Sequence, residues 1–137
     1  MSNDRMRIIE KADALADGRL RLSWSDGVEA LLTLPDLNDA GTPKIGDWGH
    51  SLLWSNGEEI GADRLWLDTL TALGRADSRA FLEWRMRNNL SLQKAGDALG
   101  LARRTVAYYS NGDRPVPKSI LLACKGWEVG QTLSIAA

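Results

Sequence analysis

The segment from 89 to 112, NLSLQKAGDALGLARRTVAYYSNG, constrains the fold more than any other part of the chain. Three of its apolar residues recur at the spacing of one helix face: Leu92, Ala95 and Leu99. Ser91 is a good helix N-cap, and Gly100 can adopt the positive φ of a tight turn. The sequence therefore predicts a helix over 91–99, a turn, and a second helix over 102–109.

The second of these helices is predicted to carry a basic and aromatic outer face. The residues expected to point outward are Arg103, Arg104, Thr105, Ala107 and Tyr108. Val106 and Tyr109 are expected to be buried, and Asn111 with Gly112 is expected to end the helix. Adjacent arginines often lie on a merely solvated face, but at this place they can also reach guanine or phosphate. The five outward residues and Asn111 are therefore the predicted DNA contacts.

The stretch from Ser78 to about Trp127 resembles the lambda-repressor/Cro-like family of helix-turn-helix DNA-binding domains. The resemblance is carried by Leu-Ser before a nine-residue helix, Gly100 at the turn, the apolar Leu101 after it, and the closing Asn-Gly. It implies an all-α domain that binds double-stranded DNA, with two copies on two half-sites.

Three positions depart from that family's pattern. Leu92 stands where the family often has a phosphate-holding glutamine, and Gly96 stands where a small alanine faces the turn. Ser110 replaces a glutamate that pairs with the first-helix arginine, here Arg85. The resemblance therefore implies that one phosphate anchor and one ion pair are missing.

The charge of the chain divides at the same place as its patterns. Residues 1–74 contain 7 Lys or Arg and 13 Asp or Glu, a balance of −6. Residues 75–137 contain 10 Lys or Arg and 5 Asp or Glu, a balance of +5. The basic half suits phosphate, whereas the acidic half is expected to be repelled by DNA and to serve another purpose.

The acidic half is predicted to form two hairpins and a helix. Polar and apolar residues alternate over 19–24, and Asp-Gly at 26–27 favours a hairpin with a partner strand over 28–34. Trp-Ser-Asn-Gly repeats the device within 51–60, and 62–70 is helical. Residues 6–16 are expected to be extended and 35–43 to be loop.

The two Trp-Ser-Asp/Asn-Gly turns, followed by Ala-Asp-Arg-Leu, resemble the bacterial domain-of-unknown-function family 2442 over roughly 9–70. This resemblance implies a compact α+β domain with no assigned catalytic chemistry. Members occur alone or joined to a helix-turn-helix, and some neighbour toxin-like genes. A protein partner for this half is therefore the alternative hypothesis.

Other chemistry finds little support in the residues. His50 is the only histidine and Cys124 the only cysteine, so no catalytic residues, metal or cofactor are expected and the chain is not expected to be an enzyme. No apolar run reaches the length of a membrane span, and a cytoplasmic address is expected. Four tryptophans are expected in cores, namely Trp24, Trp54, Trp66 and Trp84, whereas Trp48 is expected to be exposed.

Together these observations predict an α+β N-terminal domain over 1–74, followed by an all-α lambda-repressor-like helix-turn-helix domain over 75–137. Its outer helices are expected over 78–88 and 117–125, the latter ended by Gly126. The predicted function is sequence-specific DNA binding in transcriptional regulation, as a homodimer. The alternative is an antitoxin-like interaction module whose N-terminal domain binds a partner protein.

Overall fold

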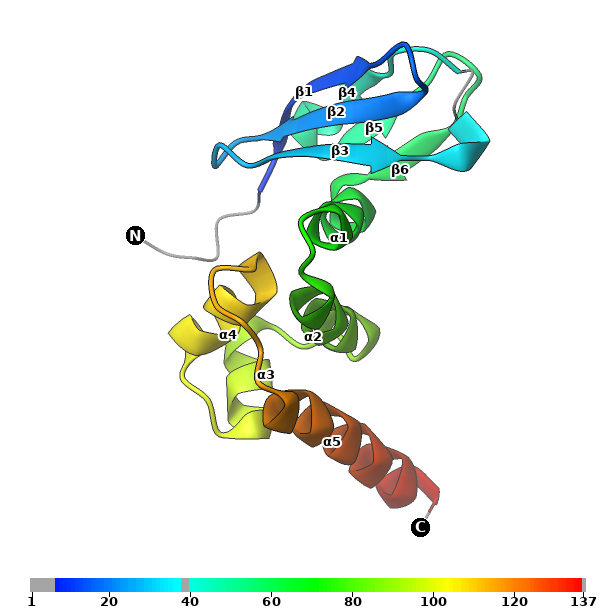
Figure 1. Ribbon diagram of the computed structural model, residues 1–137. Coiled ribbons are helices and arrows are strands. Elements are labelled where there is room, and N and C mark those ends of the chain that lie inside the picture. The colour runs from blue at the N-terminus through cyan, green and yellow to red at the C-terminus, as the bar shows by residue number, and fades with distance from the viewer. Residues whose placement is uncertain (1–6, 38–39, 137) are drawn as a thin grey trace. The chain divides into compact units, whose positions relative to one another are not determined.

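The computed structural model describes residues 7–136 of the chain except 38 and 39 (Figure 1). Residue 6 of the predicted extended segment 6–16 lies outside the described residues, as do residues 38 and 39 of the predicted loop 35–43. The chain divides into two compact units, of which one ends at Gly74 and the other begins at Arg75 and runs to the C-terminal end. Each unit is described by itself.

The described part of the first unit contains six short strands and one α-helix. Its first antiparallel sheet has the order β1 (Ile9–Ala14), β2 (Arg19–Trp24), β3 (Glu29–Thr33). Its second has the order β4 (Lys44–Gly46), β5 (Ser51–Leu53), β6 (Glu59–Gly61). Single 3-10 turns occur at Pro35–Leu37 and Asp47–Gly49, and helix α1 (Ala62–Ala72) lies against β3 and β6.

The predicted fold class was wrong and is corrected here. In place of the α+β domain followed by an all-α domain, the described residues form two separate three-stranded antiparallel sheets, and these are followed by five α-helices. Strand β1 lies within the segment 6–16 that was expected to be extended, whereas β4 was not indicated by the sequence. With only three residues, β4 is too short to show the alternation from which a half-buried strand is predicted.

The core of the first unit is organised around Trp24. Its ring meets that of Trp66 edge to face, with 5.4 Å between centroids. Its indole nitrogen donates a hydrogen bond of 3.1 Å to the hydroxyl of Thr69, which in turn donates to the carbonyl of Leu65 at 2.8 Å. All four tryptophans predicted to be core are at most 6% exposed, and Trp48 is 92% exposed, so both predictions are confirmed.

The second unit contains four helices. They are α2 (Ala76–Arg87), α3 (Leu92–Leu99), α4 (Arg103–Asn111) and α5 (Lys118–Ala136). Helix α2 packs against α4 and α5, and α3 packs against α4 and α5 (Figure 1). Six buried residues form the core between them: Phe81, Trp84, Ala95, Val106, Val116 and Cys124. Burial raises the pKa of the Cys124 thiol to about 11, as befits a small core residue.

Helix α5 is longer than predicted. Gly126 was expected to end it, but the helix continues for ten residues to Ala136. The continuation is stabilised by contacts on the side of α2, because Trp127 meets Trp84 edge to face at 5.6 Å. Glu128 accepts hydrogen bonds from Arg87 and Asn88, which lower the pKa of its carboxyl to about 2. These contacts outweigh the roughly 1 kcal/mol that glycine costs inside a helix.

Within the described residues, none of the helices combines the length and the apolar character that crossing a membrane requires.

Candidate nucleic-acid interface

The joint between α3 and α4 is built as the sequence predicts. The hydroxyl of Ser91 accepts a hydrogen bond of 3.1 Å from the backbone N–H of Lys94 and so caps α3. Gly100 ends α3 in the left-handed conformation, with φ 71°. The backbone N–H groups of Gly100 and Leu101 both donate to the carbonyl of Gly96. Two short helices are therefore held at a fixed turn.

Gly96 allows the chain after the turn to approach α3 closely. A Cβ atom at this position would lie 2.5 Å from the carbonyl oxygen of Leu101, which is backbone and cannot move aside like a flexible side chain. The hydrogen atom of glycine is thus what allows the chain after the turn to lie directly against α3. This close approach sets where α4 begins relative to α3.

Helix α4 presents most of the predicted site residues to solvent. Arg103 and Arg104 are exposed in its first turn, and Thr105, Tyr108 and Asn111 are partly exposed. The guanidinium of Arg114 lies over the ring of Tyr108, 4.2 Å from its centroid, so this ring is held in place by a cation–π contact.

The predicted outward position of Ala107 was wrong. Its side chain is 1% exposed, because it lies on the side of α4 that faces α2 and α3. The predicted burial of Tyr109 is only partial, although its ring packs edge-on against Phe81 at 5.4 Å. The outward face of α4 is therefore narrower than predicted, and it is formed by its first turn together with Tyr108 and Asn111.

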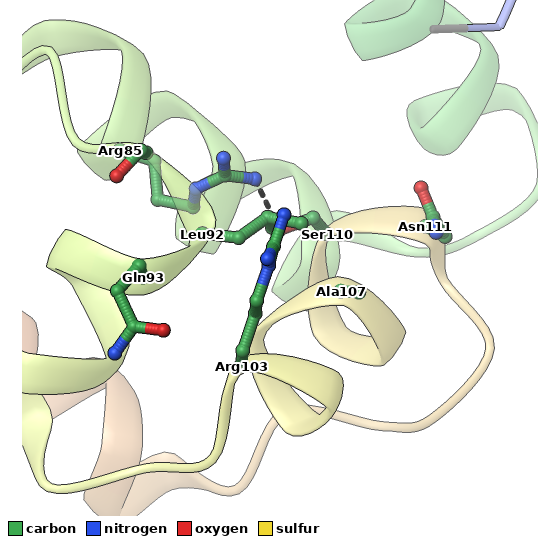
Figure 2. Close-up of a pocket in the computed structure, with 8 residues that line it drawn as sticks. Arg85, Leu92, Gln93, Arg103, Ala107, Ser110 and Asn111 are labelled. Carbon is green, nitrogen blue, oxygen red and sulfur yellow. Dashed lines mark hydrogen bonds between the residues drawn. The ribbon is translucent and has the colours of Figure 1, made fainter. Parts of the chain in front are cut away.

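A hollow of about 480 Å³ lies between α2, α3 and α4 (Figure 2). Its walls include Arg85 from α2, Gln93 from the first turn of α3, and Arg103 from the start of α4. Ala107 and Ser110 line it from α4. In Figure 2 the long side chains of both arginines extend toward Ser110. The hollow is thus continuous with the exposed first turn of α4.

Arg85 is held in this hollow by neutral groups. It donates a hydrogen bond of 2.8 Å to the hydroxyl of Ser110 and one of 3.3 Å to the carbonyl of Leu90. The hydroxyl of Ser110 donates in turn to the carbonyl of Val106 at 2.8 Å. Burial lowers the pKa of the Arg85 guanidinium, since removing a cation from water disfavours its charged form.

The C-terminal end of α4 is also fixed by an arginine. Gly112 caps the helix in the left-handed conformation with φ 76°, and its carbonyl accepts a hydrogen bond from Arg75. Arg75 also pairs with Asp77, whose other oxygen accepts from the backbone N–H of Val116 at 2.7 Å. These bonds join the start of α2 to the segment between α4 and α5, so both ends of α4 are anchored.

Sequence patterns identified the first turn of α4 but not the hollow beside it. Gln93 was not among the predicted contacts, and Arg85 was considered only as an arginine without a carboxylate partner. The two lie on different helices and meet only through the packing of α2 and α3 on α4. The replacement of glutamate by Ser110 was the one local feature that pointed to this place.

Comparison with solved structures finds a relative that is similar over most of the chain. The solved structure of "Putative DNA Binding Protein NE0471" from Nitrosomonas europaea ATCC 19718 is similar with 33% sequence identity and a TM-score of 0.63. The similarity covers 93% of this chain and 90% of that protein. No family model matches the chain, and a search of curated proteins found no match. The chain therefore belongs to the same family as this Nitrosomonas protein.

Proposed function

We propose that this chain is a sequence-specific DNA-binding protein that regulates transcription in the bacterial cytoplasm. Helices α3 and α4 act as a helix-turn-helix, and α4 enters the major groove with its first turn toward the bases. The observation that carries the proposal is the exposed pair Arg103 and Arg104 at the start of α4, next to a hollow lined by Arg85. The proposed activity is binding of DNA, and not catalysis of a reaction.

Two further facts support this function. Residues 75–137 carry a balance of +5, and this is the half that contains α4. The relative with 33% identity carries DNA binding in its name. In this proposal, attraction between basic side chains and the DNA phosphates accounts for the affinity for DNA. Guanidinium groups that reach base edges in the groove account for the preference for particular sequences.

A protein partner for the first unit is the second candidate function. Trp48 is 92% exposed and lies in a turn where it and Asp47 both have positive φ, 57° and 48°. Non-glycine residues in this conformation cost free energy, and an exposed tryptophan is typical of the centre of protein interfaces. Purification of the chain with a stoichiometric protein would favour this candidate, and retention on an operator-DNA column would favour DNA binding.

The salt dependence of duplex binding tests the DNA-binding proposal. Residues 75–137 alone are expected to bind non-specific duplex DNA more tightly than the full chain. The reason is that the net charge of −6 on residues 1–74 is repelled by the negatively charged DNA. The logarithm of either affinity should fall linearly with the logarithm of salt concentration, by about 0.9 for each phosphate neutralised. Fluorescence anisotropy between 50 and 300 mM salt, roughly the range over which counterion release is resolved, measures both slopes. A salt-independent isotherm, or no binding at low salt, refutes it.

We further propose that the protein binds DNA as a homodimer. One α4 covers too few base pairs for tight specific binding, so two copies are expected on half-sites about one DNA turn apart. The edge strands of the two sheets in the first unit and the segment from Trp127 onward in α5 are the candidate surfaces. Light scattering of the free and DNA-bound protein at micromolar concentration measures the stoichiometry, and a monomer in both states contradicts the proposal.

A further inference from the structure

The segment that follows α4 folds back over the end of that helix. The backbone N–H groups of Asp113 and Arg114 both donate to the carbonyl of Tyr108, at 2.9 and 3.4 Å. Gly112 begins this return in the left-handed conformation, and Arg75 donates to its carbonyl. The side chain of Arg114 is thereby brought over the ring of Tyr108, with 4.2 Å between the guanidinium carbon and the ring centroid.

The backbone on the other side of Arg114 is fixed as well. The ring of Pro115 sets its own φ. The next residue, Val116, is buried in the core of the second unit, and its N–H donates to Asp77 at 2.7 Å. Arg114 therefore lies on a backbone that is held at both ends, so its side chain loses less conformational freedom when it binds a ligand.

The guanidinium of Arg114 keeps its hydrogen-bond donors for a ligand. Within the part of the chain that the structure describes, this exposed group makes no hydrogen bond or ion pair, and its contact is the ring of Tyr108. A guanidinium that lies over a ring contacts it with its flat face. Its N–H donors lie in its own plane and thus remain accessible.

Tyr108 places this pair on the same face of α4 as Arg104. The two residues are four positions apart, about one turn, and Arg104 is exposed while Tyr108 is partly exposed. Val106 and Ala107 lie on the buried side of the helix. In the proposed complex the exposed face meets base edges, so the pair lies next to the base position of Arg104.

Two neighbouring base pairs match the chemistry of this pair. Guanine presents two acceptors in the major groove, which an arginine fork bonds, and thymine presents an apolar methyl group, which suits an aromatic ring. Neighbouring base pairs are about 3.4 Å apart, close to the 4.2 Å between the guanidinium of Arg114 and the ring of Tyr108.

We infer that Tyr108 and Arg114 together read one base step. The ring contacts the methyl group of a 5-methylpyrimidine, which is thymine in unmodified DNA, and the guanidinium bonds the guanine next to it. This inference rests on the proposed function. It adds a base-reading residue that lies outside α4, namely Arg114, and it names the bases that the pair prefers.

Base analogues test the inference with the full chain, on the duplex that it selects from a random library. Uracil differs from thymine, and cytosine from 5-methylcytosine, by the methyl group alone, and 7-deazaguanine lacks the N7 acceptor of guanine. At one pyrimidine position, the methyl group is expected to raise wild-type affinity about threefold to fivefold in both comparisons. At the guanine beside it, 7-deazaguanine is expected to lower the affinity at least about fivefold.

Variants assign the two effects to the two residues. Tyr108→Ala is expected to remove the effect of the methyl group, and Tyr108→Phe, which keeps the ring, to retain it. Arg114→Gln is expected to remove the effect of 7-deazaguanine at this one guanine. Lys118→Gln is the matched control, because it removes the same charge at another exposed position and should retain both effects. If Tyr108→Ala fails to fold, Arg114→Gln at its exposed position still decides.

The outcomes separate this inference from the proposed function. Loss of each effect in its own variant supports the inference. Wild-type binding without a methyl effect overturns it and leaves DNA binding in place. The same holds if Arg114→Gln weakens all duplexes alike and lowers the salt slope by about one, because Arg114 then contacts phosphate only. If the wild type binds no duplex, the proposed function fails and the inference fails with it.

Discussion

Replacing Gly96 with alanine is expected to destabilise the second unit by about 2–3 kcal/mol. The added methyl group would lie 2.5 Å from the carbonyl oxygen of Leu101, closer than real Cβ contacts allow, and the atom it meets is backbone. The chain after the turn must therefore move away from α3. For a unit of this size the loss corresponds to a fall in melting temperature of roughly 10–20 °C. Thermal unfolding followed by circular dichroism measures it.

The matched control is the same substitution at Gly126. This glycine lies inside α5, and a Cβ there meets no atom within 4 Å. Alanine should therefore stabilise the helix by about 0.5–1 kcal/mol, because glycine is the poorer helix former. The two variants are thus expected to shift the melting temperature in opposite directions. Equal shifts, or a stable Gly96→Ala protein, would show that the turn tolerates a side chain.

Gly96 also shows which features of the structure local sequence patterns can predict and which they cannot. The sequence predicts the capping by Ser91 and the left-handed turn at Gly100, because each depends on only a few neighbouring residues. That position 96 requires glycine follows only from the distance to Leu101, five residues further on. The pattern indicated merely a small residue facing the turn.

The wrong predictions for Gly126 and Ala107 also result from contacts with parts of the chain outside the segment that carried the pattern. Gly126 was predicted to end α5, but the contacts of Trp127 and Glu128 with α2 come from residues about 40 positions earlier in the chain. Ala107 was predicted to point outward because helical periodicity does not indicate how many neighbours surround a helix. With α2 and α3 both packed on α4, its outward face is narrower.

The same limit applies to the candidate site. Charge balance and spacing suffice to select the first turn of α4, since both are properties of a short segment. The hollow beside it joins Arg85 to Ser110 across 25 positions, and only the packing of three helices forms it. The sequence therefore indicates the part of the site that is expected to select bases, and it does not indicate the hollow that lies next to that part.

Replacing Arg104 with alanine is expected to weaken binding to the preferred operator by about 1–3 kcal/mol, or roughly 5- to 150-fold. Arg104 is exposed in the first turn of α4, the part that a recognition helix directs at the base edges. If its guanidinium forks onto one guanine, preference at a single base position is lost. Selection of bound sequences from a random duplex library, done for wild type and variant, measures both the affinity and the preference.

Matched variants give this experiment its control. Arg103→Ala, in the lining of the hollow between α2, α3 and α4, is expected to weaken binding to all sequences alike and to reduce the salt slope by about one. Lys125→Ala removes one exposed charge from α5 and should leave base preference unchanged. The exposed substitutions are each expected to change stability by no more than about 0.5 kcal/mol, so melting curves verify the fold.

Tyr108 completes the comparison, because it follows Arg104 by four residues, about one turn, on α4 and its ring is held by Arg114. Tyr108→Ala is expected to change preference at a base position adjacent to that of Arg104. If Arg103→Ala, Arg104→Ala and Tyr108→Ala all fold and all retain the affinity and preference of the wild type, α4 does not contact the bases. The exposed Trp48 of the first unit then becomes the better guide, and binding of a protein partner replaces DNA binding as the leading hypothesis.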